Sequence, residues 1–122
     1  MSRVILDDRI RNLLSAGVCQ LLGYRGHVCA DGYQIHHIIN DTLTQNNKAA
    51  RELAKLPELL AVVCGYANRE RLADEKEARR LLILQAADWY GPERLWALLI
   101  QLPADYGLGD TIAELEAMAP GS

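Results

Sequence analysis

The sequence predicts one compact, mainly α-helical domain with at most one short β-hairpin in its middle. The chain has 122 residues, which is enough for one hydrophobic core and too few for two ordinary ones. Half of the residues are hydrophobic and about a quarter are charged, as in globular proteins. Apolar residues recur three and four positions apart along most of the chain, which is helical spacing. We expect the domain to cover residues 1–119 and residues 120–122 to fray.

The first helix is predicted from an apolar stripe near the N-terminus. A stripe with this spacing covers one face of a helix, and glycines commonly end helices. We therefore expect one helix over residues 10 to 22, ending in the glycine-containing turn at residues 23 to 26. The stripe consists of Ile10, Leu13, Leu14, Val18, Leu21 and Leu22.

Two longer helices are predicted in the C-terminal half. The segment 74 to 90 opens with acidic residues, which suit the positive end of a helix dipole, and Gly91 ends it. Pro92 fits the first turn of the next helix, and Pro103 ends that helix. We expect the two helices to pack as a hairpin. The first has a buried stripe of Ala78, Leu81, Leu82, Ala86 and Trp89, and core packing is also expected for Tyr90 and Trp96.

Capping residues predict the start of two shorter helices. Asn47 precedes "KAARELAKL", and an asparagine side chain can accept a hydrogen bond from the first turn of a helix. Thr111 and Glu114 have the spacing of a capping box, which would open a short final helix.

The middle of the chain allows two backbone conformations. "GYQIHHII" and "LLAVV" are short apolar runs, which fit either strands or buried helix segments. Asp31 and Gln34 could form a capping box for a helix. In a strand, His36 and His37 would point to opposite faces, whereas in a helix they would lie about 100° apart.

The net charge limits the possible nucleic-acid contact. The chain carries a net charge of −3, and its pI is about 5.5. Proteins that cover much DNA usually present a basic face to the phosphates, so a large DNA footprint is disfavoured. A small site that binds phosphate through a metal ion is still allowed, because the ion supplies the positive charge.

The cysteines indicate a reducing compartment. Cys19, Cys29 and Cys64 are odd in number and lack CxxC spacing, which argues against a disulfide framework and a four-cysteine zinc site. We expect Cys29 and Cys64 to be small buried apolar residues and His27 to be a loop residue, with a metal ligand as the alternative for His27. No signal peptide and no apolar run of about 18 residues is present. We therefore expect a cytoplasmic protein without a membrane partner.

One region resembles a known motif. "HVCADGYQIHHIIN" and "LPELLAVVCGYANRERLAD", within residues 27 to 74, look like the two halves of an HNH nuclease motif. The resemblance implies two strands and a helix that hold one divalent metal ion: Mg, Mn, Zn or Ni. It implies His37 as the general base that activates water, and His36 and Asn68 as metal ligands. It also implies DNA as a partner, with a small footprint.

The sequence departs from the family pattern at two places. Leu59 in "PELL" stands where the family has an asparagine that orients the loop carrying the base. Ala67 stands where a second cysteine of the family's zinc knuckle would follow Cys64. A zinc site built from Cys29, His36 and Cys64 would require the fold to bring them together.

Two functional hypotheses follow. The first is an HNH-like metal-dependent endonuclease, or a degenerate relative that binds nucleic acid. The alternative is a non-catalytic all-α interaction or regulatory module that self-associates or binds a protein partner through an apolar helix face. The backbone at residues 33 to 38 separates them: a strand paired with a second strand supports the first hypothesis, and a continuous helix removes it.

Overall fold

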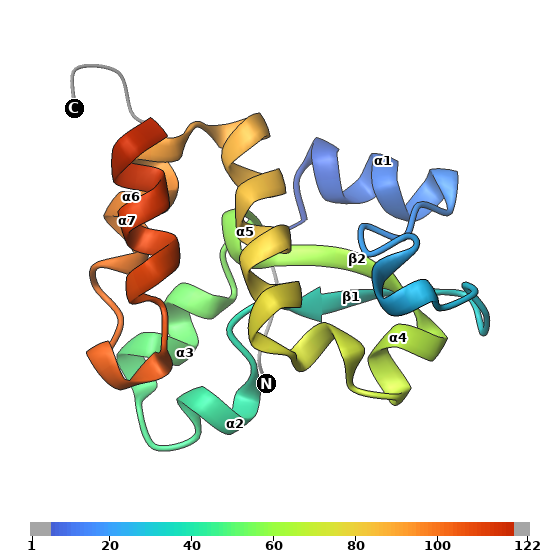
Figure 1. Cartoon of the computed structure of the whole chain (residues 1–122), viewed down its shortest axis with the longest axis horizontal. Coiled ribbons are helices and arrows are strands. Elements are labelled where there is room, and N and C mark those ends of the chain that lie inside the picture. Colours follow the sequence, from blue (N-terminus) through green and yellow to red (C-terminus); the bar gives the residue numbers. More distant parts are fainter. Residues whose placement is uncertain (1–5, 119–122) are drawn as a thin grey trace.

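The computed structural model describes residues 6 to 118, which form seven α-helices and one two-stranded sheet (Figure 1). The mainly α class with one hairpin is therefore confirmed. Two of the seven are short helices of about one turn. The predicted fraying of residues 120–122 lies outside the described residues. The helices are α1 (Asp8–Ala16), α2 (Asp41–Thr44), α3 (Lys48–Ala54), α4 (Gly65–Arg69), α5 (Lys76–Tyr90), α6 (Pro92–Leu99) and α7 (Gly109–Met118).

The sheet is an antiparallel pair of β1 (Tyr33–His37) and β2 (Leu60–Cys64), and it resolves the ambiguity in the middle of the chain. Every residue of β2 is buried. Leu60 and Val62 pack against α1, while Ala61 and Val63 belong to the main core. Figure 1 shows the hairpin between α1 above and α4 below. A strand covered on both faces reads as a continuous apolar run, which is why "LLAVV" lacks alternation.

The helix predicted over residues 10 to 22 is wrong at its C-terminal end. Gly17 adopts the left-handed conformation (φ 69°), and its N–H donates to the carbonyl groups of Leu13 and Leu14. This is a glycine helix cap, and it stops α1 at Ala16. The last part of the predicted stripe lies in a loop, where Leu22 is 80% exposed.

The helix that Asp31 and Gln34 could have opened does not form. Asp31 and Gly32 both have positive φ, 67° and 74°, so the chain turns sharply before β1. The Gly32 carbonyl then accepts a hydrogen bond from the N–H of Gly65, at 2.8 Å. The loop before β1 is thereby attached to the start of α4.

The C-terminal helices follow the prediction except at two points. α5 and α6 meet at Gly91, with Pro92 in the first turn of α6, and they pack together. However, α7 begins at Gly109, so Thr111 lies inside the helix and the predicted capping box is wrong. Trp89 is 60% exposed rather than packed in the core. Asn47 caps α3 as predicted, accepting from the Ala50 N–H at 2.9 Å.

Candidate metal centre at the end of the hairpin

An open pocket of about 470 Å³ lies at the end of β1 and contains all three predicted site residues. His36 and His37 reach it from the last two positions of β1, and Asn68 from α4. α4 follows β2 directly, so the strand–strand–helix order places one amide beside two imidazoles. Residues far apart in sequence are thereby brought together.

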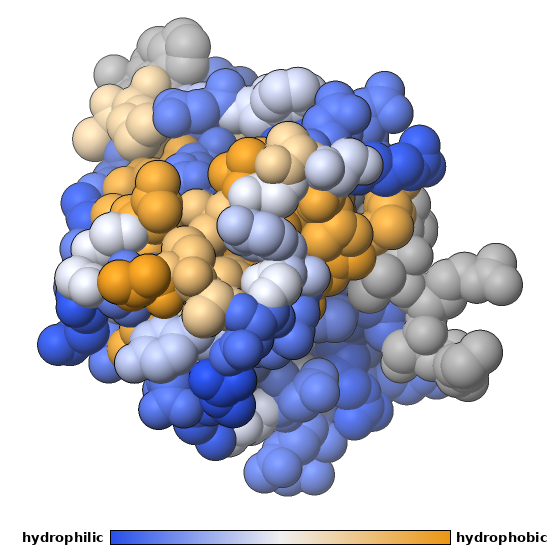
Figure 2. Space-filling model, turned by 90° about the vertical axis from the view of Figure 1, so that its right-hand side faces the viewer, coloured by the Kyte–Doolittle hydropathy of each residue, from blue (hydrophilic) through white to orange (hydrophobic). Residues whose placement is uncertain are grey.

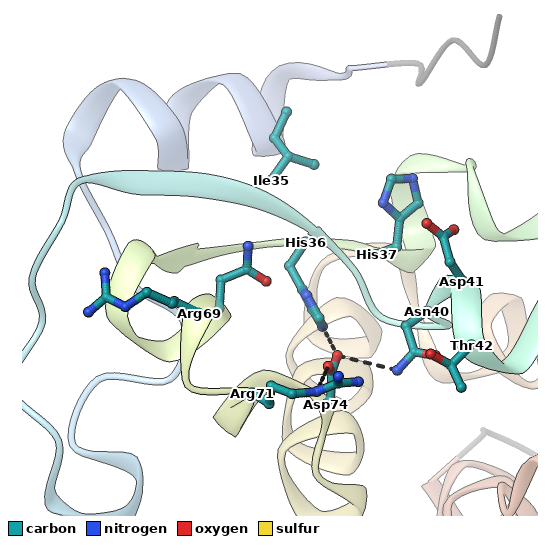
Figure 3. A pocket seen from close by; sticks show the side chains of 10 residues that line it. Ile35, His36, His37, Asn40, Asp41, Thr42, Arg69, Arg71 and Asp74 are labelled. Atoms are coloured by element: carbon teal, nitrogen blue, oxygen red, sulfur yellow. Dashed lines mark hydrogen bonds and ion pairs between the residues drawn. The ribbon is translucent and has the colours of Figure 1, made fainter.

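The two histidines point to opposite sides of β1, as adjacent residues of a strand must. Figure 3 shows the side chains of Ile35 and His37 on one side of the strand and that of His36 on the other, directed towards Asp74. The strand alternative weighed for "YQIHHII" is thus the observed one, and it gives the two imidazoles different surroundings.

His36 is buried and has an unsatisfied nitrogen. Its side chain is 5% exposed, and its Nε2 atom has no hydrogen-bond partner among the described residues. Burial lowers the pKa of His36, an effect that Asp74 and Asn68 oppose. The imidazole is therefore neutral near pH 7, which is the form that binds metals. A buried nitrogen without a partner fits the role of a metal ligand, because an ion would satisfy it.

Asp74 is a site residue that the sequence analysis placed only in the acidic first turn of a predicted helix. Its Oδ1 atom lies 4.0 Å from His36 Nε2, and its carboxylate is 25% exposed. Asn40 Nδ2 donates to Oδ1 at 3.3 Å, and Arg71 Nε lies 3.3 Å from Oδ2 (Figure 3). The carboxylate is thus held in place beside His36. Nothing in the local sequence marks it, because the approach depends on the short turn Leu72–Asp74.

Asn68 is oriented by a neighbour on β1. Its Nδ2 atom donates to Gln34 Oε1 at 2.5 Å, so the amide nitrogen is engaged. The amide oxygen is the remaining acceptor of this side chain. Asn68 is also one of the neighbours that oppose the lowering of the His36 pKa by burial. An amide oxygen beside a neutral imidazole is a reasonable pair of ligands for a divalent ion.

His37 lies between two hollows. It lines the main pocket and also a smaller cavity of about 150 Å³, which it shares with Arg51 and Lys55. The side chain is half-buried, and Figure 3 shows Asp41 beside it. An imidazole in this position can reach solvent on one side and a ligand in the pocket on the other.

Leu59 occupies the position where the family has asparagine, and it is fully buried in the core. Its carbonyl accepts the Ile38 N–H at 3.0 Å, one step beyond the His37–Leu60 pair. The segment after His37 is therefore held by the backbone and by apolar packing.

A second group of ligand-type residues gathers at the opposite end of the hairpin. The ligand atoms of Cys19, His27, Cys29 and Cys64 all lie within 4.8 Å of one another, so this cluster could hold a metal ion. Cys64 is buried and His27 lies in a loop, as expected, Cys19 is buried too, and the structure adds that the four side chains converge. His36 is not a member, so the grouping of Cys29 and Cys64 with His36 is wrong. In the sequence, only the close spacing of His27 and Cys29 in "HVC" indicated a possible metal site. Cys19 and Cys64 come from other segments, so local spacing could not group them with this pair.

The pKa values of two cysteines in this cluster, Cys29 and Cys64, are shifted in opposite directions. Burial raises the pKa of Cys29 to about 12, and its neighbours Cys19 and Cys64 add to that rise. Burial also acts to raise the pKa of Cys64, but hydrogen bonds from the backbone at Ala67 and Ala30 oppose it, and the pKa is lowered to about 6. Cys64 is therefore the more readily ionised of the two.

No family model, curated protein or solved structure matches this chain. None of the helices within residues 6 to 118 has the length and apolar character needed to cross a membrane.

Proposed function

We propose that this chain is an HNH-like, metal-dependent endonuclease with a small DNA footprint. The observation that carries the proposal is the strand–strand–helix unit that brings His36, His37 and Asn68 to one pocket, with a neutral and unpartnered nitrogen on His36. The paired strand at residues 33 to 37 is the conformation that favours this hypothesis over a continuous helix.

His36 Nε2 and the Asn68 amide oxygen are the ligands in this proposal, and the Asp74 carboxylate is close enough to join them or to orient His36. Mg, Mn, Zn or Ni could serve, since imidazole, amide and carboxylate donors suit each of them in part. A bound divalent ion supplies Lewis-acid stabilisation of the charge that develops on the phosphate and the leaving oxygen.

His37 is the general base in this proposal. It would accept a proton from the attacking water, a task that imidazole performs well near neutral pH. His37 lines both the main pocket and the smaller cavity, so water from solvent can reach its ring. This position supports the role of general base. Asp41 beside it can orient the ring, as carboxylates commonly do for catalytic histidines.

Four basic residues near the site could contact phosphate, and three of them are paired with acidic neighbours: Arg69 with Asp31, Arg71 with Asp74 and Lys55 with Glu52. Arg69 and Arg71 line the main pocket, and their side chains are 57% and 68% exposed. Arg51 and Lys55 line the smaller cavity beside His37. A group of this size could contact only a few phosphates, which agrees with the overall negative charge and a small footprint.

Plasmid nicking with purified protein and added divalent metal tests the proposal. We expect His37→Ala to lower the rate at saturating metal by about 10²- to 10⁴-fold, the usual contribution of a general base. His36→Ala is the matched variant: because it removes a ligand, it should raise the metal concentration needed for half-maximal rate. Circular dichroism checks that both variants keep the fold. Equal nicking by wild type and His37→Ala would assign the activity elsewhere and refute the proposal.

The alternative function, binding to a protein partner or to a second copy of the chain, is favoured by one observation. Three of the seven exposed large apolar side chains in the described part of the chain, Val18, Leu22 and Val28, lie between α1 and β1, and a fourth, Tyr33, begins β1. Figure 2 shows apolar side chains gathered on the face of the molecule at the right of Figure 1. Such a surface is commonly a contact site.

A further inference from the structure

We propose that Cys19, His27, Cys29 and Cys64 bind one structural zinc ion in a closed Cys₃His site. This site is separate from the His36 pocket, and it would exist whether or not the chain is a nuclease. In the register of the sheet, Cys64 pairs with Tyr33 at one end and Leu60 pairs with His37 at the other. Four residue steps along a strand separate the two ends by about 13 Å.

The distances between the ligand atoms fit a tetrahedral zinc site. His27 Nε2 lies 4.0 Å from Cys19 Sγ, 3.6 Å from Cys29 Sγ and 3.4 Å from Cys64 Sγ. Zinc bonds of about 2.3 Å to sulfur and 2.0–2.1 Å to nitrogen, at tetrahedral angles, place each sulfur about 3.6 Å from the nitrogen. The observed values scatter around that figure, so small shifts would complete the site.

The tautomer of His27 directs a lone pair at the three sulfurs. His27 Nδ1 lies 2.8 Å from the carbonyl oxygen of Tyr24. A carbonyl only accepts, so Nδ1 must carry the proton and Nε2 is then free to bind a metal. This outer hydrogen bond is the usual support of a zinc-bound histidine. Stacking on Tyr66, with 5.9 Å between ring centroids and 7° between planes, also fixes the ring.

Backbone N–H groups are arranged to stabilise two of the sulfurs as thiolates. The Cys64 N–H donates to Cys19 Sγ at 3.3 Å, and the Ala67 N–H donates to Cys64 Sγ at 3.4 Å. Cys64 also caps α4, so its sulfur lies at the positive end of that short helix. Three thiolates and one imidazole are soft to intermediate ligands, which select zinc over magnesium or calcium.

A structural role follows from the ligand number and from the loop that supplies the ligands. Four protein ligands leave no open coordination position for a substrate. Three of the ligands come from the segment between α1 and β1, where Gly17, Gly23, Arg25, Gly26, Asp31 and Gly32 all have positive φ. The backbone hydrogen bonds within this segment close turns of three residues, such as His27 N–H to the Tyr24 carbonyl, and no long helix or strand forms there. The ion would attach this segment to the end of β2 and the start of α4.

Metal analysis of protein purified under reducing conditions is the first test. We expect one zinc ion per chain, and cobalt replacement should give sulfur-to-cobalt charge-transfer absorption and the visible bands of a tetrahedral ion. Because the chain contains only these three cysteines, mass spectrometry after maleimide treatment should show no label on the zinc form and three labels after chelation. Amide exchange should accelerate at residues 17 to 32 after chelation, and α5 should change little.

Variants locate the ion. Cys19→Ser and His27→Ala should lose zinc, while His27→Cys should keep it as a four-cysteine site. His37→Ala is the matched histidine control, because His37 is a ligand in neither site, and it should retain the full zinc content. Zinc lost in His37→Ala but kept in Cys19→Ser would overturn the proposal. If the ligand variants do not fold, the wild-type cobalt spectrum still decides: no sulfur bands, or a disulfide in freshly purified protein without metal, would also overturn it.

Discussion

Gly65 is a residue at which two segments touch backbone to backbone. It begins α4, and a Cβ atom placed there would lie 2.2 Å from the carbonyl oxygen of Asp31. A contact that short forces one of the two segments to move. The φ of Gly65 is not in the left-handed region, so backbone conformation does not require glycine here. The close approach of the Asp31 carbonyl does.

We expect Gly65→Ala to lower the free energy of unfolding by about 1–3 kcal/mol, the usual cost of overpacking a well-packed interior. Gly109→Ala is the control, because Gly109 begins α7 and has open space around it. Alanine favours helix over glycine by up to about 1 kcal/mol, so this variant should be as stable as wild type or slightly more so. Denaturant titration measures both. Equal stability of Gly65→Ala and wild type would show that the loop yields easily.

At the scale of single residues, the sequence predicted the members of the pocket better than those of the sulfur cluster. His36, His37 and Asn68 were found because a motif fixes their spacing, and the structure places them together. Asp74 reaches His36 only through tertiary packing, and Cys19 reaches Cys64 across the whole of the first loop and the hairpin. Local patterns carry no information about such approaches.

Among the elements, α1 is fixed to its neighbours by a buried arginine. Arg9 is 5% exposed and donates from Nη2 to the Leu60 carbonyl at 2.9 Å, which attaches α1 to the start of β2. Arg9 Nε also donates to the Tyr90 hydroxyl at the end of α5, and that hydroxyl donates to the carboxylate of Asp7, the cap of α1. Three elements therefore meet in one polar network.

This network predicts a loss of stability at high pH. Burial, together with the hydrogen bond to Asp7, raises the pKa of Tyr90 to about 12 from the usual 10.0. The folded state keeps the phenolic proton longer than the unfolded state does. The stabilisation of the folded state by this raised pKa is therefore complete below about pH 10 and is lost as the pH rises towards 12. In Tyr90→Phe the decline in stability over that window should be shallower. Identical slopes for the two proteins in denaturant titrations at increasing pH would contradict this.

The elements that the sequence predicted well are those with local signals. α5 and α6 have helical stripes bounded by Gly91 and Pro92, and both formed as expected. α1 was predicted too long because apolar residues continue past Gly17, where the left-handed backbone ends the helix. The hairpin remained ambiguous because five buried residues in a row suit a strand or a helix equally. Pairing with a distant segment decided between them.

For the molecule as a whole, the apolar face between α1 and β1 predicts self-association. We expect wild-type protein to show a sedimentation coefficient that rises with concentration, and Leu22→Ser to weaken that rise. Ile100→Ser is the matched control: Ile100 is an exposed apolar residue (49%) at the end of α6, outside this face. It should behave like wild type. A wild-type protein that stays monomeric at all concentrations would exclude a second copy as the occupant of this face.

The complete burial of β2 also determines where each histidine points. A slip of one residue between the strands would exchange the faces of β1 relative to its partner, so that His36 would turn towards α1 and His37 towards the interior. Five buried apolar side chains packed on both sides of β2 resist that slip. The directions of the two imidazoles are thus set by the buried apolar residues of the partner strand.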